Sequence, residues 1–212
     1  MTFAGFPESG LIFFEGLEAD NSKTYWTTHR QTYDEDVRAP MQALLVDLES
    51  EFGTAKLYRP YRDVRFSRDK TPYKTAVAAS VGEYYVQLSA DGIMVAGGVY
   101  HPARDQLERL RRAVADDVQG PALERLVAGL RGQGWTIGGD LLKTSPRGYP
   151  PDHPRIELLR HRSMVASRQW EPQPWLHTAR ARTRVRDGWR QLAGFTAWIE
   201  ANVGASSEVG EG

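Results

Sequence analysis

Apolar residues recur every three to four positions in the first quarter of the chain, which is the spacing of amphipathic helices. Ser9 can cap a first short helix, and Asn21 or Ser22 can cap a second one. Pro40 then opens a third helix, which Gly53 ends. The apolar faces of the three helices consist of Leu11, Phe13, Phe14 and Leu17; of Tyr25, Trp26, His29, Tyr33 and Val37; and of Met41, Leu44, Leu45, Leu48 and Phe52.

The pattern changes after Gly53 to short segments that are rich in valine and aromatic residues. Turns that contain glycine, at Gly82-Glu83 and at Ala90-Asp91-Gly92, separate the later segments. Such segments are typical of antiparallel strands joined by tight turns. The strands are predicted over residues 57–66, 76–81, 84–89 and 92–100.

Helical spacing returns after His101-Pro102 and again after Gly120-Pro121, and a further strand is predicted over residues 135–139. Prolines scattered between residues 141 and 174 exclude long regular structure there, apart from a short helix over residues 156–161. A last helix is predicted over residues 185–203. We therefore predict one α+β domain over residues 1–203, with helices flanking a central, mostly antiparallel sheet, and a disordered tail over residues 204–212.

The amino-acid composition limits the binding partners, the chemistry and the cellular location that we expect for the protein. The 27 basic and 27 acidic residues cancel, so the field of the whole molecule does not attract DNA or an anionic membrane. Without cysteine, the chain has no disulfides, thiolate metal sites or cysteine nucleophiles. No signal peptide and no apolar run of membrane-spanning length is present, so the sequence predicts a cytoplasmic protein.

Charge is concentrated in the segment from Arg62 to Thr75, which holds five cationic side chains and two carboxylates in fourteen residues. Arginine and lysine interleaved with hydroxyl groups are suited to binding phosphate, sulfate or carboxylate. We interpret the segment as an anion-binding site. The alternative is a surface hairpin with solvated ion pairs, such as Arg62–Asp63 or Asp69–Lys70, each of which contributes little.

A second candidate is the sequence Gly97-Gly98-Val99-Tyr100-His101-Pro102, at a strand end before a helix. Paired glycines permit close approach of a backbone, and a helix start offers free N–H groups to an anion. The spacing matches neither a dinucleotide fingerprint nor a P-loop. A crowded corner between strand and helix explains the glycines equally well.

The third candidate, Lys143 to Arg155, combines cations with Tyr149, Asp152 and His153. A histidine beside an acid can transfer protons near neutral pH. Alternatively, this segment is a loop stiffened by proline, in which Asp152 caps the helix that follows.

Other chemistries find little support in the sequence. The five histidines are scattered, without a helical i, i+4 pair or a carboxylate cluster, so no metal site is predicted. No nucleophile elbow of the Gly-x-Ser-x-Gly type is present. We also predict no cofactor.

The three polar segments, together with the opening Asn21-Ser-Lys-Thr-Tyr-Trp26, resemble a family of bacterial and fungal proteins called domain of unknown function 2461. The resemblance covers roughly residues 3–203. It implies a single domain with its signature in these segments, and it implies no established reaction. The family's usual paired asparagines appear here as Asn21-Ser22, a departure that concerns a helix start more than a binding group.

These observations lead to a functional hypothesis: the three segments meet in one pocket that binds an anionic small molecule bearing phosphate or carboxylate. The predicted ligand residues are Arg62, Arg65, Ser67, Lys70, Tyr73, Lys74, Tyr100, Arg147 and Tyr149. If the protein is an enzyme, His153 or Lys70 is the candidate for proton transfer. The alternatives are binding of single-stranded nucleic acid, or a basic face that docks an acidic protein partner. The sequence does not determine the oligomeric state.

Overall fold

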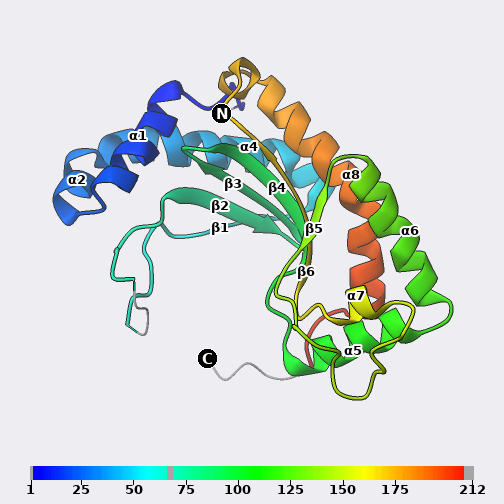
Figure 1. Ribbon diagram of the computed structural model, residues 1–212. Coiled ribbons are helices and arrows are strands. Elements are labelled where there is room, and N and C mark those ends of the chain that lie inside the picture. Colours follow the sequence, from blue (N-terminus) through cyan, green and yellow to red (C-terminus); the bar gives the residue numbers. More distant parts are fainter. Residues whose placement is uncertain (1, 66–68, 208–212) are drawn as a thin grey trace. The chain divides into compact units, whose positions relative to one another are not determined.

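The computed structural model describes residues 2–65 and 69–207 (Figure 1). Its fold class is α+β, as predicted, with a six-stranded antiparallel sheet in the order β1-β2-β3-β4-β6-β5. The strands are β1 (Lys56–Leu57), β2 (Ala76–Val81), β3 (Tyr84–Ser89), β4 (Gly92–Val99), β5 (Thr136–Gly138) and β6 (Met164–Trp170).

The chain divides into two compact units, which are described separately below. The first unit comprises residues 1–95 and 169–188, and the second comprises residues 96–168 and 189–212. Strands β4 and β6 and the last helix each have residues in both units. The expectation of a single domain over residues 1–203 stays a prediction.

The first unit begins with five consecutive helical segments. They are α1 (Glu8–Ala19), α2 (Lys23–Thr28), α3 (Arg30–Thr32), the π-helical segment η1 (Tyr33–Arg38) and α4 (Ala39–Phe52). Ser22 caps α2 by accepting a hydrogen bond from the Tyr25 N–H at 3.1 Å. The predicted cap at Ser9 is wrong, because α1 already begins at Glu8 and the Ser9 hydroxyl instead donates to Asp36. As predicted, Gly53 ends α4, with a positive φ of 94°.

These helices cover one face of the neighbouring strands. In Figure 1, α1 and α4 lie along one side of β2 and β3. The alternating residues Val77 and Ala79 of β2, with Val86 and Leu88 of β3, are buried as part of the core. Because side chains alternate across a strand, the residues between them point to the opposite face.

Two strand predictions needed correction. Up to residue 65, the strand expected over residues 57–66 is only the two-residue β1, followed by an irregular connection that has an isolated bridge between Tyr61 and Tyr73; residue 66 lies outside the described part of the chain. Strand β6 was missed, because the surrounding prolines suggested an irregular loop. Pro154 and Pro172 lie outside β6, and Ile137 of β5 pairs with Ala166 within it.

The second unit has helices of its own, and a buried arginine contacts the end of the first of them. These helices are α5 (Arg104–Ala115), α6 (Gln119–Gly132), the short α7 (Ile156–Leu159) and the later part of α8 (Arg180–Asn202). Helix η2 (Pro174–His177) precedes α8 and belongs to the first unit. Arg155 is 8% exposed and donates to the carbonyls of Val114 at 2.6 Å and Ala115 at 2.8 Å. Its guanidinium therefore satisfies acceptors at the end of α5 that have no partner within the helix.

The chain after α8 continues along α5. Gln106 donates to the Gly204 carbonyl at 2.7 Å, and Ser207 donates through its N–H to Asp105 at 2.8 Å. Hydrogen bonds from the Ser207 N–H, and then from the side chains of Ser206 and Arg109, lower the pKa of Asp105. The predicted disorder of residues 204–212 stays a prediction, and residues 208–212 lie outside the described part of the chain.

Candidate functional site

The segment Arg62–Thr75 connects β1 to β2 in the first unit, and Ser67 lies outside the described residues. Its two described arginines, Arg62 and Arg65, have internal partners. Arg62 bonds to Asp69 and to the Thr71 hydroxyl, and Arg65 reaches Asp63 through Nε at 3.0 Å and Nη2 at 2.7 Å. The ion pairs are thus Arg62–Asp69 and Arg65–Asp63, and neither pair named in advance is formed among the described residues.

The carboxylates of this connection are well satisfied. Hydrogen bonds from the Arg65 side chain lower the pKa of Asp63 to about 2. Those from the Thr71 backbone and hydroxyl lower the pKa of Asp69 to about 2. Lys70 donates to the Val64 carbonyl at 2.9 Å. Much of the charge in this connection is therefore engaged in ion pairs and hydrogen bonds within the connection itself.

Tyr73, a predicted ligand residue, is buried by the structure. It is 6% exposed, and its ring stacks on Trp26 at 4.4 Å with an interplanar angle of 7°. The Asn21 side chain binds the Tyr73 backbone twice, accepting from its N–H at 3.0 Å and donating to its carbonyl at 3.1 Å. The Tyr73 ring therefore serves the packing of α2 against the connection.

Lys74 belongs to a different surface, which we call the basic tyrosine face. This name denotes the outward side of β1, β2 and β3, with the residues Lys56, Tyr58, Lys74, Ser80 and Tyr85. Arg59, which follows Tyr58 in the sequence, adds a positive charge near Lys74. Lys56 and Tyr85 both pair with Ser80, and the Tyr58 hydroxyl donates to the Ser80 hydroxyl at 3.0 Å. These contacts place the side chains on the face opposite the helices.

Cations gather around the ring of Tyr58 on this face. The ammonium of Lys74 lies 5.4 Å from the ring centroid and that of Lys56 lies 5.9 Å from it, within the range of cation–π contacts. Burial lowers the pKa of Lys74, and the charge of Arg59 lowers it further. Within residues 2–65 and 69–207, neither Lys56 nor Lys74 forms an ion pair with a carboxylate, whereas the charge of Arg59 also acts on Asp63 and helps to lower its pKa.

Sequence reasoning found Lys74 but missed the rest of the basic tyrosine face. A signal was available in the period of two along Lys56-Leu57-Tyr58, which places Lys56 and Tyr58 on one side. The predicted strand began at Leu57 and excluded Lys56. The contribution of Tyr85 depends on the register of β2 and β3, in which it lies opposite Ser80.

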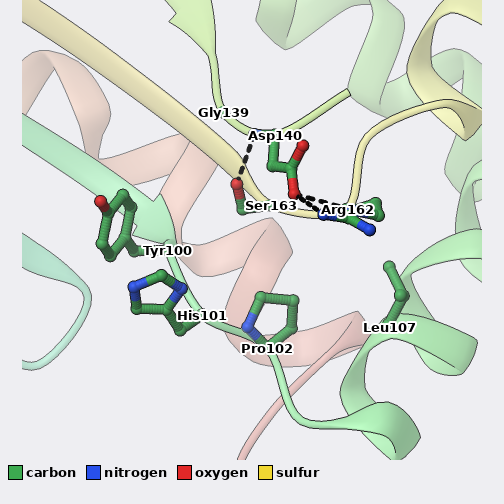
Figure 2. Close-up of a pocket in the computed structure, with 8 residues that line it drawn as sticks. All are labelled: Tyr100, His101, Pro102, Leu107, Gly139, Asp140, Arg162 and Ser163. Atoms are coloured by element: carbon green, nitrogen blue, oxygen red, sulfur yellow. Dashed lines mark hydrogen bonds and ion pairs between the residues drawn. The ribbon is translucent and has the colours of Figure 1, made fainter. Parts of the chain in front are cut away.

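The Gly97–Pro102 segment lies in the second unit, and the structure favours the crowded corner as the reason for Gly98. Gly98 has a φ of 121°, and a Cβ there would lie 2.3 Å from the Met164 carbonyl oxygen of β6. Tyr100 is 67% exposed and, with His101, lines a pocket of about 510 Å³ (Figure 2). The close approach at Gly98 is therefore to a neighbouring strand, while Tyr100 remains accessible.

The third segment also lies in the second unit, and it does not line that pocket. His153 accepts the Arg155 N–H through Nδ1 at 3.0 Å, and Asp152 does not cap α7. Arg147 is exposed, and Tyr149 is half-buried. Because the Arg62–Thr75 segment belongs to the other unit, the pocket shared by all three segments stays a prediction, as does catalysis by His153 or Lys70.

No group of three or more His, Asp or Glu side chains in residues 2–65 and 69–207 is arranged to hold a metal ion. In the same residues, no helix combines the length and the apolar character needed to cross a bilayer.

Comparison with known proteins gives a family and no curated relative. No curated protein matches the chain. The model of a family described as conserved hypothetical protein (DUF2461) matches residues 9–198. This match spans most of the chain and includes all three polar segments and the basic tyrosine face. The protein therefore belongs to the DUF2461 family.

Proposed function

We propose that the protein binds an anionic small molecule, bearing phosphate or carboxylate, on the basic tyrosine face. The observation that carries this proposal is the pair of ammonium groups of Lys56 and Lys74 beside the Tyr58 ring, neither with a carboxylate partner in the described residues, and with the charge of Arg59 close to Lys74. Like charges held together raise one another's free energy, and an anion relieves that repulsion.

The surrounding groups suit such a ligand. The Tyr58 and Ser80 hydroxyls are hydrogen-bonded to each other, and hydroxyl groups can also donate to a phosphate or carboxylate oxygen. Tyr58 and Tyr85 have ring centroids 6.5 Å apart and are half-buried, so they offer aromatic surface to the body of the ligand. Partial burial of Lys74 strengthens its interaction with an anion, because solvent screens it less.

Arg62, Arg65 and Lys70 contribute less to this proposal than the sequence suggested. Each is bonded within the connection, to Asp69, Asp63 and the Val64 carbonyl. A ligand that recruits them must replace existing bonds. The proposed site therefore centres on Lys74, with Lys56 and Arg59 beside it.

A thermal-shift screen of phosphorylated and carboxylated metabolites tests the proposal. A ligand present at about 100 times its dissociation constant stabilises the protein by about 2.7 kcal/mol. Lys74→Met removes the charge while keeping most of the length of the side chain. We expect it to weaken binding of a hit by about tenfold or more, the effect of one lost charge-assisted hydrogen bond.

Arg65→Met is the matched control, since it removes a cation of the same connection that is already paired with Asp63. We expect this variant to retain the ligand. Equal loss of ligand binding in both variants would place the site on the connection between β1 and β2. Unchanged binding in Lys74→Met would refute the proposal that the ligand binds to the basic tyrosine face. Binding of single-stranded RNA with a steep salt dependence, in place of any metabolite, would favour the nucleic-acid alternative.

A further inference from the structure

A second binding site is formed by the pocket of the second unit. Its volume of about 510 Å³ is that of a small-molecule site. Three segments line it: the end of β4 with the start of α5, the turn after β5, and the start of β6. Figure 2 shows Asp140, Arg162 and Ser163 along one side, and Pro102 and Leu107 along the other.

The polar side of the pocket is fixed by a close contact between two backbones. Gly139 has a φ of 124°, and a Cβ there would lie 2.2 Å from the Ser163 carbonyl oxygen. The Asp140 N–H donates to the Ser163 hydroxyl at 2.7 Å, and the Arg162 N–H donates to the Asp140 carbonyl at 2.7 Å. The segments that carry the two charged side chains are therefore held in register.

Asp140 and Arg162 form an ion pair that leaves one end of each group available. Both Nε and Nη2 of Arg162 donate to the same carboxylate oxygen, Oδ2. In the described part of the chain, Oδ1 of Asp140 and Nη1 of Arg162 make no hydrogen bond. The two side chains are 54% and 53% exposed, so solvent or a ligand can reach them.

The other walls are apolar or aromatic. Pro102 and Leu107 are half-buried, and the Tyr100 and His101 rings have centroids 4.1 Å apart. The lining thus offers an acceptor, a donor and an apolar surface, with its one carboxylate balanced by its one guanidinium. A simple anion bound to Arg162 would be opposed by Asp140, and a simple cation bound to Asp140 would be opposed by Arg162.

We propose that this pocket binds a free α-amino acid with an apolar side chain. The α-ammonium donates to Oδ1 of Asp140, the α-carboxylate accepts from Nη1 of Arg162, and the side chain lies against Pro102 and Leu107. A zwitterion satisfies both charged groups at once. This site is independent of the basic tyrosine face, which would attract a net anion.

The test uses L-leucine and L-phenylalanine as probes in isothermal titration calorimetry with the full-length protein. We expect at least one of them to bind. Its N-acetyl derivative, which lacks the ammonium, and its amide, which lacks the carboxylate, should each bind about tenfold more weakly or worse. If neither amino acid binds at about 10 mM, the proposal is overturned. Equal binding of the parent amino acid and its acetylated derivative also overturns it.

Variants assign the binding to the pocket. Asp140→Asn and Arg162→Gln should each weaken binding of the amino acid by about tenfold. Glu108→Gln removes a similarly exposed carboxylate from the Arg104–Glu108 ion pair of α5, outside the pocket, and should bind normally. Should a pocket variant fail to fold, the series of derivatives on the parent protein still decides. Lys74→Met should leave amino-acid binding unchanged, so this proposal and the proposed function fail separately.

Discussion

At the scale of single residues, the second unit depends on Arg155 and on the glycine that accommodates it. A Cβ on Gly120 would lie 2.3 Å from Arg155 Nε and 2.3 Å from the Val114 carbonyl oxygen. Because the guanidinium is buried, it has little room to move aside. Arg155, which the sequence grouped with the cations of a candidate site, therefore holds the end of α5.

Gly120→Ala should destabilise the protein by about 1–3 kcal/mol, the usual cost of forcing an added group into a packed interior. Gly129→Ala is the control in the same helix, because no atom lies within 4 Å of the added Cβ. This second change should stabilise by about 0.5–1 kcal/mol through the greater helix propensity of alanine. Urea denaturation measures both, and equal stability of the two variants would contradict the role assigned to Arg155.

At the scale of elements, one side-chain amide joins the start of α2 to the connection between β1 and β2. Asn21 acts toward the Tyr73 backbone as a neighbouring strand would, with one bond donated and one accepted. The adjoining stack of Trp26 on Tyr73 buries the contact. The neighbouring residues Asn21 and Ser22 thus have different roles, because Ser22 caps α2 and Asn21 binds the connection.

Asn21→Ala should destabilise the protein by about 1–3 kcal/mol, because it leaves the N–H and carbonyl of the largely buried Tyr73 without their partner. Ser22→Ala removes only the helix cap and should cost about 1 kcal/mol. Free energies of unfolding from urea titrations compare the two. A smaller loss for Asn21→Ala than for Ser22→Ala would show that the link between elements matters less than the cap.

At the scale of the whole molecule, the net charge is zero, but individual groups titrate in different pH ranges. Burial lowers the pKa of His161, whose Nδ1 lies 3.0 Å from the Ser163 carbonyl oxygen. The folded state then binds fewer protons than the unfolded state as the pH falls below 6.5. Asp63 and Asp69, with pKa values of about 2 in the folded protein against 3.8 ordinarily, behave likewise in acid.

Stability should therefore fall in two stages as the solution is acidified from pH 7. The first stage begins near pH 6.5, where His161 protonates in the unfolded chain. The second lies between pH 3.8 and about 2, where the stabilising contribution of the carboxylates is lost. The urea midpoint measured against pH checks this profile. His161→Gln should flatten the first stage alone, and an unchanged slope between pH 7 and 5.5 would contradict the assignment.

The sequence by itself determined the local pattern of this protein. The periods of apolar residues predicted the helices at the start of the chain and strands β2, β3 and β4, and thereby the α+β class. The polar segments were enough to suggest the family. Periodicity is set by neighbouring residues, so these features can be read without knowing what packs against them.

Tertiary structure decided which polar groups have partners. Arg62 forms an ion pair with Asp69, and Arg65 forms one with Asp63. Lys74 has no carboxylate partner in the described residues, where its neighbours include Tyr58 and Arg59. Asn21 reaches Tyr73 across 52 positions of sequence, and Asp140 meets Arg162 across 22. Electrostatics and burial depend on distance in space, so only the folded chain distinguishes a free cation from a paired one.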